Sequence, residues 1–174
     1  MAQTVHTTIT RHGPANPRDV VIKTNDVLYQ NVHERLGEDH FMTFTVLKYL
    51  GQGTFQHAGD HLSFVVYRQQ QQLCERIPTN GAWLNMIPDI SEATKNGEFT
   101  LNIGDILVLY TDGLTEAFNR QNEMLDIQRF TELVSAHAEK ELVAMRDAIL
   151  QDVLTWCNNT REDDMSLVIV RRIR

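Results

Sequence analysis

The chain has 174 residues, of which 42% are hydrophobic, and a formal net charge of −7 at pH 7. This size suits one ordinary domain with a sizeable core, because a domain of roughly 150 residues buries about two thirds of its unfolded surface. The acidic balance argues against nucleic acid and anionic membranes as main partners, since both attract basic patches, and no stretch reaches the roughly 18 consecutive apolar residues of a membrane span.

The start of the sequence, MAQTVHTTITRHG, lacks the apolar core of a secretory signal, so the expected location is the cytoplasm. The two cysteines, Cys74 and Cys157, lie far apart and form neither a disulfide framework nor a metal-ligand spacing. Both are expected to be free thiols.

The first half of the chain predicts one helix followed by four strands. Asn16 and Pro17 form a helix start, and an apolar stripe at helical spacing extends the helix over residues 17–36, where Gly37 ends it. Runs rich in β-branched and aromatic residues, separated by short turns, then predict an antiparallel meander. Its four strands cover residues 41–50, 54–58, 62–68 and 73–77.

The second half begins with an irregular segment, residues 79–97, expected to be a loop packed over one sheet. A short strand at 99–101 precedes an apolar strand at 106–110, which lies between the turn pairs Gly104-Asp105 and Asp112-Gly113 and reads as central and buried. Amphipathic helices at 123–136 and 139–156 and a final strand at 165–170 follow. Strands followed by helices, with antiparallel hairpins, predict an α+β fold with helices packed on sheets.

Acidic residues stand beside two of the predicted strands. Asp112 directly follows the strand at 106–110, and Glu162-Asp163-Asp164 directly precedes the last strand. If these strands are neighbours, their carboxylates meet and supply the hard oxygen ligands that Mg²⁺ and Mn²⁺ prefer. The alternative is that Asp112 and Gly113 only form a turn and that the later acidic run is solvated.

Histidines give a weaker signal. His57 and His61 have the spacing of a metal pair, but Gly59 between them and the strand-like flanks exclude the helical geometry that places two imidazoles on one face. A turn role for His61 is therefore favoured over metal ligation, which stays a weak alternative. The sequence has no Gly-x-Ser-x-Gly elbow, and Gly51-Gln-Gly53 is interpreted as a hairpin turn and not as a phosphate loop.

Taken together, several segments resemble one family. The strings GDILVLYTDGLTEAFN and REDDMSLVIV, the HAGDH turn followed by FVVYR, and NGAWLNMIPDI are similar, in this order, to the bacterial SpoIIE-type branch of the PPM (PP2C-like) metal-dependent serine/threonine phosphatases. The helix with Pro17, Asn25 and Leu28 and the strand FMTFTVLKYL also fit the family's middle portion. The resemblance extends from about Pro17 to the end of the chain.

The resemblance implies an antiparallel β-sandwich flanked by helices, with a binuclear Mn²⁺ or Mg²⁺ centre at one end. The family's metal ligands correspond to Asp112 and Asp163, and Asp164, Gly113 and Glu116 correspond to positions that support them. A metal-bound hydroxide would attack the phosphorus of phosphoserine or phosphothreonine in line. For Glu116 the alternative is a favourable interaction with the start of a helix. The implied partner is a phosphorylated bacterial regulatory protein, in an anti-sigma-factor switch or a two-component pathway.

The chain also departs from the family pattern. The family bridges its two metals with an aspartate from an early GDxxD or DVxGHG motif, and this sequence contains neither. Met1 falls about where that motif leads into the family's first helix, so residues 1–174 are expected to correspond to a single, N-terminally truncated domain, the C-terminal two thirds or more of the family domain. The glycine usual after the tryptophan-containing turn is replaced by Asn85.

Three alternatives follow from this departure. The chain is a catalytic phosphatase domain, a degenerate or truncated module that binds a signalling partner without catalysis, or a chain that a second copy completes as a homodimer through unpaired sheet edges.

Overall fold

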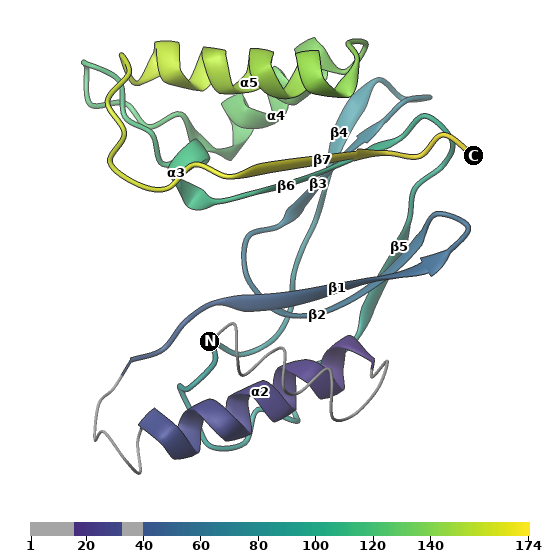
Figure 1. Cartoon of the computed structure of the whole chain (residues 1–174), viewed down its shortest axis with the longest axis vertical. Helices are drawn as coiled ribbons and strands as arrows, with labels where there is room; N and C mark the ends of the chain where they lie inside the picture. The colour runs from purple at the N-terminus through teal and green to yellow at the C-terminus, as the bar shows by residue number, and fades with distance from the viewer. Residues whose placement is uncertain (1–15, 33–39) are drawn as a thin grey trace. The chain divides into compact units, whose positions relative to one another are not determined.

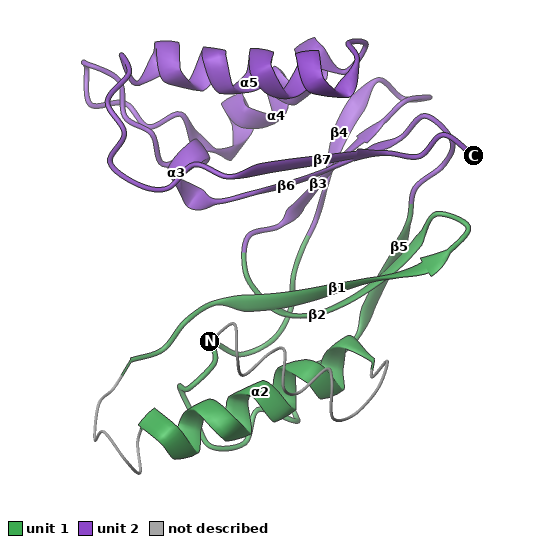
Figure 2. Ribbon diagram, viewed as in Figure 1, with its two compact units in different colours: residues 1–61, 78–100 green, residues 62–77, 101–174 purple. Residues whose placement is uncertain are grey.

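The computed structural model describes residues 16–32 and 40–174, which form four helices and seven strands (Figure 1). The described residues divide into two compact units (Figure 2). The first unit holds the described part of residues 1–61 together with Pro78–Thr100, and the second holds Leu62–Ile77 and Leu101–Arg174. The described part of the first unit has one antiparallel sheet and one helix, and the second unit has one antiparallel sheet and three helices.

The sheet of the first unit has three strands in the order β1-β2-β5. Its strands are β1 (Phe44–Gly51), β2 (Thr54–Asp60) and β5 (Gly97–Thr100), all antiparallel. Helix α2 (Pro17–Asn31) packs on β1 and β2. It begins as expected, because the Asn16 side chain accepts a hydrogen bond from the Asp19 backbone N at 3.0 Å and Pro17 occupies the first turn.

A buried asparagine connects α2 to the irregular segment that precedes β5. The side-chain nitrogen of Asn25 donates to the carbonyls of Ile87 and Pro88, each at 3.1 Å, and its oxygen accepts from the Asn85 backbone N at 2.8 Å. Leu84 and Ile90 of the same segment lie in a core cluster with Val21 and Ala58. The expected packed loop is therefore present.

The sheet of the second unit has four strands in the order β4-β3-β6-β7, again all antiparallel. Its strands are β3 (Phe64–Arg68), β4 (Leu73–Ile77), β6 (Ile106–Tyr110) and β7 (Leu167–Arg171). The apolar run at 106–110 is the central strand β6, in which Ile106, Leu107 and Val108 are almost completely buried. The prediction of a central buried strand is confirmed.

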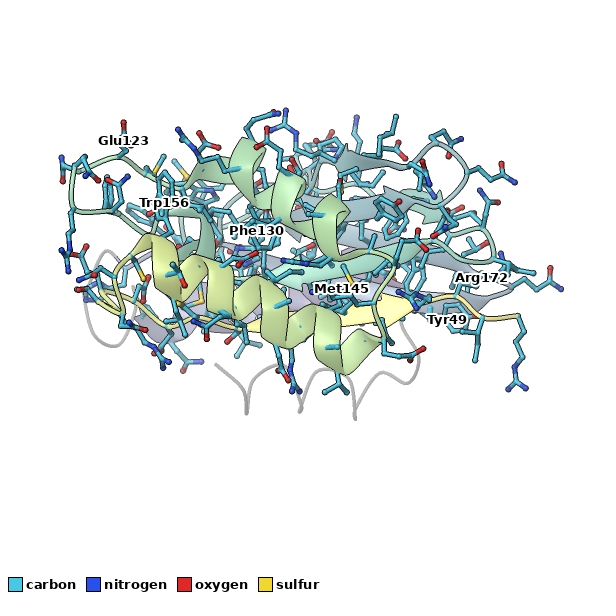
Figure 3. The ribbon with its side chains drawn as sticks, turned by 90° about the horizontal axis from the view of Figure 1, so that it is seen from above. Tyr49, Glu123, Phe130, Met145, Trp156 and Arg172 are labelled. Carbon is cyan, nitrogen blue, oxygen red and sulfur yellow. The ribbon has the colours of Figure 1, made fainter. Side chains whose placement is uncertain are left out.

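Two long helices, α4 (Asp126–His137) and α5 (Leu142–Trp156), lie together against this sheet (Figure 1). Their apolar faces form the core of the second unit with the side chains of β3 and β6 that point toward them. Phe130 of α4 and Met145 of α5 are fully buried and lie between the two helices in Figure 3. Arg171 joins β7 to this layer by donating to the carbonyls of Ala138 and Lys140.

Several predicted boundaries and one predicted topology were wrong. The strand predicted at 41–50 begins at Phe44, the strand predicted at 54–58 continues to Asp60, and helix α4 begins at Asp126, whose carboxylate accepts from the Arg129 backbone N at 2.9 Å. The four-strand meander does not form, because β2 pairs with β1 and β5 while β3 pairs with β4 and β6. Residues 33–37, where the first helix was expected to end, lie outside the described residues.

No helix within residues 16–32 and 40–174 combines the length and the apolar character that crossing a bilayer would require.

Candidate metal site

The carboxyl end of β6 and the start of β7 are joined beyond their last strand pair, Tyr110 with Leu167. Thr111 makes this connection. Its backbone N donates to the Ser166 carbonyl at 3.2 Å, and its hydroxyl accepts from the Ser166 N at 2.8 Å while donating to the Asp164 carbonyl at 2.7 Å. The segments that carry Asp112 and Asp163 are therefore held side by side, as the neighbouring strands predict.

Asp112 is the first residue of α3 (Asp112–Thr115), a helix of four residues. Its carboxylate accepts a hydrogen bond from the Gly113 backbone N at 3.0 Å, and its carbonyl accepts from the Glu116 N at 2.7 Å. Thr111 makes no capping bond to this helix, because its side chain is already bonded to Ser166 and Asp164. The local fold therefore fixes the backbone of Asp112 and leaves its side chain exposed to solvent.

Gly113 sets how closely the two segments approach. A Cβ atom at this position would lie 2.7 Å from the Asp164 carbonyl oxygen and 3.3 Å from the Asp163 carbonyl carbon. The first distance is too short for any side chain, the second is tight, and both are to backbone atoms. Gly113 is therefore required for close packing of the segment 163–164 against α3, which is a physical reason for glycine after Asp112.

Asp163 lies in a bend of the backbone before β7, and Asp164 follows it. The Asp163 carboxylate accepts from the Asp164 backbone N at 2.7 Å, and both side chains are exposed. A hollow of about 140 Å³ opens beside Gly113, and Glu116, Glu162 and Asp163 are among the residues that line it. Ala117, Phe118 and Met165 supply apolar wall.

The donor set fits part of a hard-cation site. Within the described residues, neither Asp112 nor Asp163 forms a salt bridge with a basic side chain, so both carboxylates can accept a cation. Magnesium is commonly held by one or two carboxylates and several waters, and two exposed carboxylates suit such a shell. However, residues 16–32 and 40–174 contain no group of three or more His, Cys, Asp or Glu side chains arranged to hold a metal ion. The described residues thus do not supply a bridging carboxylate for two ions.

The two remaining predicted residues, Glu116 and His61, belong to different units. Glu116 follows the last residue of α3, so the expected interaction with the start of a helix is wrong, because the helix ends where Glu116 stands. His61 belongs to the first unit, where its Nδ1 lies 3.0 Å from the Thr43 hydroxyl and its backbone bonds to Thr79. These bonds suit the expected turn role of His61.

Two features were not predicted, one beside Asp112 and one in the first unit. Thr111 was not singled out from the sequence, and only its position between a buried strand and an Asp-Gly turn could have suggested a connecting role. Asn85 adopts a left-handed conformation, with φ of 69°, which asparagine tolerates better than most residues. Asparagine can thus occupy a position where glycine is usual without forcing the loop into another conformation.

Comparison with solved structures shows the fold of PP2C-type phosphatase domains. The SiaA-PP2C domain of Pseudomonas aeruginosa is 16% identical with a TM-score of 0.75 over 97% of this chain and 66% of that chain. The phosphatase domain of SpoIIE from Bacillus subtilis, presoaked with Mn, is 13% identical with a TM-score of 0.62 over 99% of this chain and 73% of that chain. The RsbU and RsbW domains of Rv1364c from Mycobacterium tuberculosis are 20% identical with a TM-score of 0.69, covering 98% of this chain and 45% of that chain.

A family model described as Stage II sporulation protein E (SpoIIE) matches residues 1–173, and the chain belongs to this family of PP2C-like protein phosphatases. The chain spans just under two thirds of the SiaA structure and less than half of the Rv1364c structure. A sequence comparison with curated proteins found no match.

Proposed function

We propose that this chain acts as a metal-dependent phosphoprotein phosphatase domain that hydrolyses phosphoserine or phosphothreonine on a bacterial regulatory protein. One observation carries the proposal. Thr111 and Gly113 hold the segments of Asp112 and Asp163 side by side, with both carboxylates exposed, in a chain of the SpoIIE family. The expected regulatory setting is cytoplasmic, either an anti-sigma-factor switch or a two-component pathway.

Asp112 and Asp163 would hold Mn²⁺ or Mg²⁺, which supplies an activated water and neutralises the charge of the phosphoryl group. Both carboxylates accept a hydrogen bond from the next backbone N–H, and this contact orients each one without consuming all of its acceptor capacity. Thr111 maintains the spacing of the two segments. Solved structures with this fold include a PstP catalytic domain in complex with two manganese ions, which supports this choice of metal.

The direct test is Mn²⁺-dependent hydrolysis of a phosphoserine protein by the chain and by Asp112→Asn, which keeps the shape of the side chain and removes its charge. We expect activity to fall roughly 100-fold, because several kcal/mol of charge stabilisation are lost with the ligand. Asp147→Asn is the matched control, since Asp147 is an exposed acid on α5 that pairs only with the neighbouring Arg146 in the described structure. Equal activity in the chain and in Asp112→Asn would refute the proposal.

A second function, docking of a signalling partner without catalysis, is favoured by the lack of a third metal-ligating side chain within the described residues. Titration calorimetry with Mn²⁺ separates the two. Stoichiometric binding of two ions, lost in Asp163→Asn, supports the phosphatase. Absence of binding together with absence of hydrolysis supports the docking module. Sedimentation at several concentrations tests in parallel whether a homodimer forms.

A further inference from the structure

The first unit exposes a cluster of large apolar side chains far from Asp112 in sequence. Five residues with exposed fractions from 37% to 60% form what we call the aromatic–methionine patch, namely Phe41, Met42, Trp83, Met86 and Ile87. Aromatic residues and methionine are enriched in the centres of protein–protein interfaces. Scattered single apolar residues are normal on a surface, but residues joined in one patch call for an explanation.

Direct contacts join the two segments of the patch. Met42 and Leu84 exchange both backbone hydrogen bonds, at 3.1 and 2.8 Å, which places the segment 41–42 beside the segment 83–87. The rings of Phe41 and Trp83 lie 5.4 Å apart between centroids and are inclined by 30°. These contacts bring Phe41, Met42 and Trp83 together, and Met86 and Ile87 follow Trp83 within four positions on the same segment.

The patch is also held in place before any partner arrives. The indole N–H of Trp83 donates to the Asp60 carboxylate at 2.8 Å, which fixes the ring while leaving part of it exposed. The backbone beneath Met86 is fixed by buried Asn25, which bonds to Asn85, Ile87 and Pro88. A surface fixed in this way loses little conformational entropy on binding, which favours affinity.

Acidic side chains flank the patch. Asp89 follows Ile87 and Pro88 directly, and Asp26 of α2 lies near enough for the two carboxylates to repel each other. Partial burial is the main cause that raises the pKa of Asp26, and the negative charge of Asp89 raises it further. Hydrogen bonds from Ser91 and the positive charge of the nearby Arg18 hold the pKa of Asp89 below its ordinary value, so Asp89 stays ionised.

We propose that the aromatic–methionine patch docks an amphipathic segment of a partner protein whose apolar face covers the patch and whose Lys or Arg side chains lie against Asp26 and Asp89. An anionic membrane is disfavoured because its surface charge has the same sign as this acidic margin. This docking needs no metal and no phosphatase activity, so it is tested independently of the proposed function.

The probe is a synthetic helical peptide of about 14 residues, with leucines at positions i, i+3, i+4 and i+7 and lysines among the others. A scrambled peptide of equal composition keeps the charge and lacks the apolar face. We expect the patterned peptide to bind in the micromolar range, to shift the Trp83 fluorescence of a Trp156→Phe variant, and to bind more weakly at high salt. The scrambled peptide should bind at least about tenfold more weakly, because the apolar contacts are lost.

Variants locate the binding surface. Met86→Ser with Ile87→Ser should weaken binding at least about tenfold without altering net charge, since burial of one large apolar side chain is worth that much in affinity. Val143→Ser, at a side chain that is 62% exposed on α5, is the matched control and should bind like the unchanged chain. Asp26→Asn with Asp89→Asn should reduce the salt dependence.

Three outcomes would overturn the proposal. The first is equal affinity for the patterned and scrambled peptides. The second is that the chain binds vesicles containing phosphatidylglycerol and that Met86→Ser/Ile87→Ser loses this binding. The partner would then be a membrane. The third is concentration-dependent dimerisation lost in the same variant, because the occupant would then be a second copy of the chain. A circular dichroism spectrum equal to that of the unchanged chain confirms that each variant is folded.

Discussion

Asp105 is a buried carboxylate that the sequence marks only as part of a turn. Its side chain accepts hydrogen bonds from Arg68 Nη1 at 2.8 Å, the Asn102 N at 2.9 Å and the Gln69 N at 3.0 Å. Its carbonyl accepts from the Arg172 N at 3.0 Å. One residue thus joins the start of β6 to the end of β3 and to β7, and so helps to fix the strand that ends at Asp112.

Asp105 should make stability depend on pH in the acid range. Burial acts to raise the pKa of Asp105, but the hydrogen bonds from Arg68, Asn102 and Gln69 together outweigh burial and hold the pKa below its ordinary value. An unfolded aspartate titrates near pH 3.9, so the stabilisation is fully present above about pH 4 and is lost as the pH falls through the folded pKa.

Urea unfolding measured between about pH 7 and pH 2 should therefore show a loss of stability on the acid side. We expect Asp105→Asn to lower the free energy of unfolding at pH 7 by about 3 kcal/mol, because Arg68 loses its buried partner, and to flatten the acid-side slope. The control is Asp147→Asn. If Asp105→Asn kept the slope of the unchanged chain, the acid dependence would have to come from other carboxylates.

A second prediction at the scale of one residue concerns Gly113. Gly113→Ala should destabilise the protein by about 1–3 kcal/mol, because the added Cβ would overlap the Asp164 carbonyl. Gly51→Ala is a useful comparison, since its Cβ would meet nothing within 4 Å and only its φ of 101° is strained. Thermal unfolding of both variants compares the cost of the steric overlap at position 113 with the cost of the backbone strain at position 51. A smaller loss in Gly113→Ala than in Gly51→Ala would contradict the close approach of the two segments.

At the scale of the elements, the spacing of hydrophobic residues predicted whether a segment is a helix or a strand better than it predicted which strands pair. The apolar run 106–110 and the helical stripes of α4 and α5 indicated the correct element types, because each pattern is contained within one segment. The meander failed because β2 and β3 are neighbours in sequence and belong to different sheets. Strand pairing depends on contacts with β5 and β6, which are distant in sequence, and no local pattern encodes them.

In the candidate site, too, the sequence indicates features that lie within one segment and does not indicate contacts between distant segments. Asp112 and Asp163 could be singled out as candidate ligands because a carboxylate beside an apolar strand is unusual and each lies next to its own strand, and their role as ligands stays a prediction. The bonds that join the two segments could not, because the Thr111 hydroxyl reaches Asp164 and Ser166, more than fifty positions away. The role of Asp105 was missed for the same reason, since its partner Arg68 lies on another strand.

Asn25 of α2 binds the segment that precedes β5 to this helix. Asn25→Ala should lower the free energy of unfolding by about 2–4 kcal/mol, because the buried N–H of Asn85 and the carbonyls of Ile87 and Pro88 lose their partner. Asn31→Ala is the control, since Asn31 is at the exposed end of the same helix and bonds only to Val27 in the described structure. Chemical denaturation measures both. A loss as small as that of Asn31→Ala would show that the segment is held mainly by Leu84 and Ile90.

At the scale of the whole molecule, the chain passes between the two units three times, after His61, Ile77 and Thr100. Each unit is therefore assembled from separate stretches of sequence. The folded first unit closes the stretch 62–77 as a loop, and the folded second unit closes 78–100. Closing a flexible loop of about this length costs on the order of 3 kcal/mol in conformational entropy. When one unit is already folded, the folding of the other unit does not incur this cost again.

This connectivity predicts that the two units unfold together, and the two tryptophans allow a test. Trp83 lies in the first unit and Trp156 in the second, where its indole N–H donates to the Ala117 carbonyl at 3.2 Å. In Trp156→Phe only Trp83 reports, and in Trp83→Phe only Trp156 reports. We expect each variant to show the same urea midpoint by fluorescence and by circular dichroism, as a cooperative transition requires. Fluorescence midpoints that differ from the circular dichroism midpoint in opposite directions in the two variants would show that the units unfold independently. In that case the free energy of unfolding measured for Asp105→Asn would belong to the second unit alone.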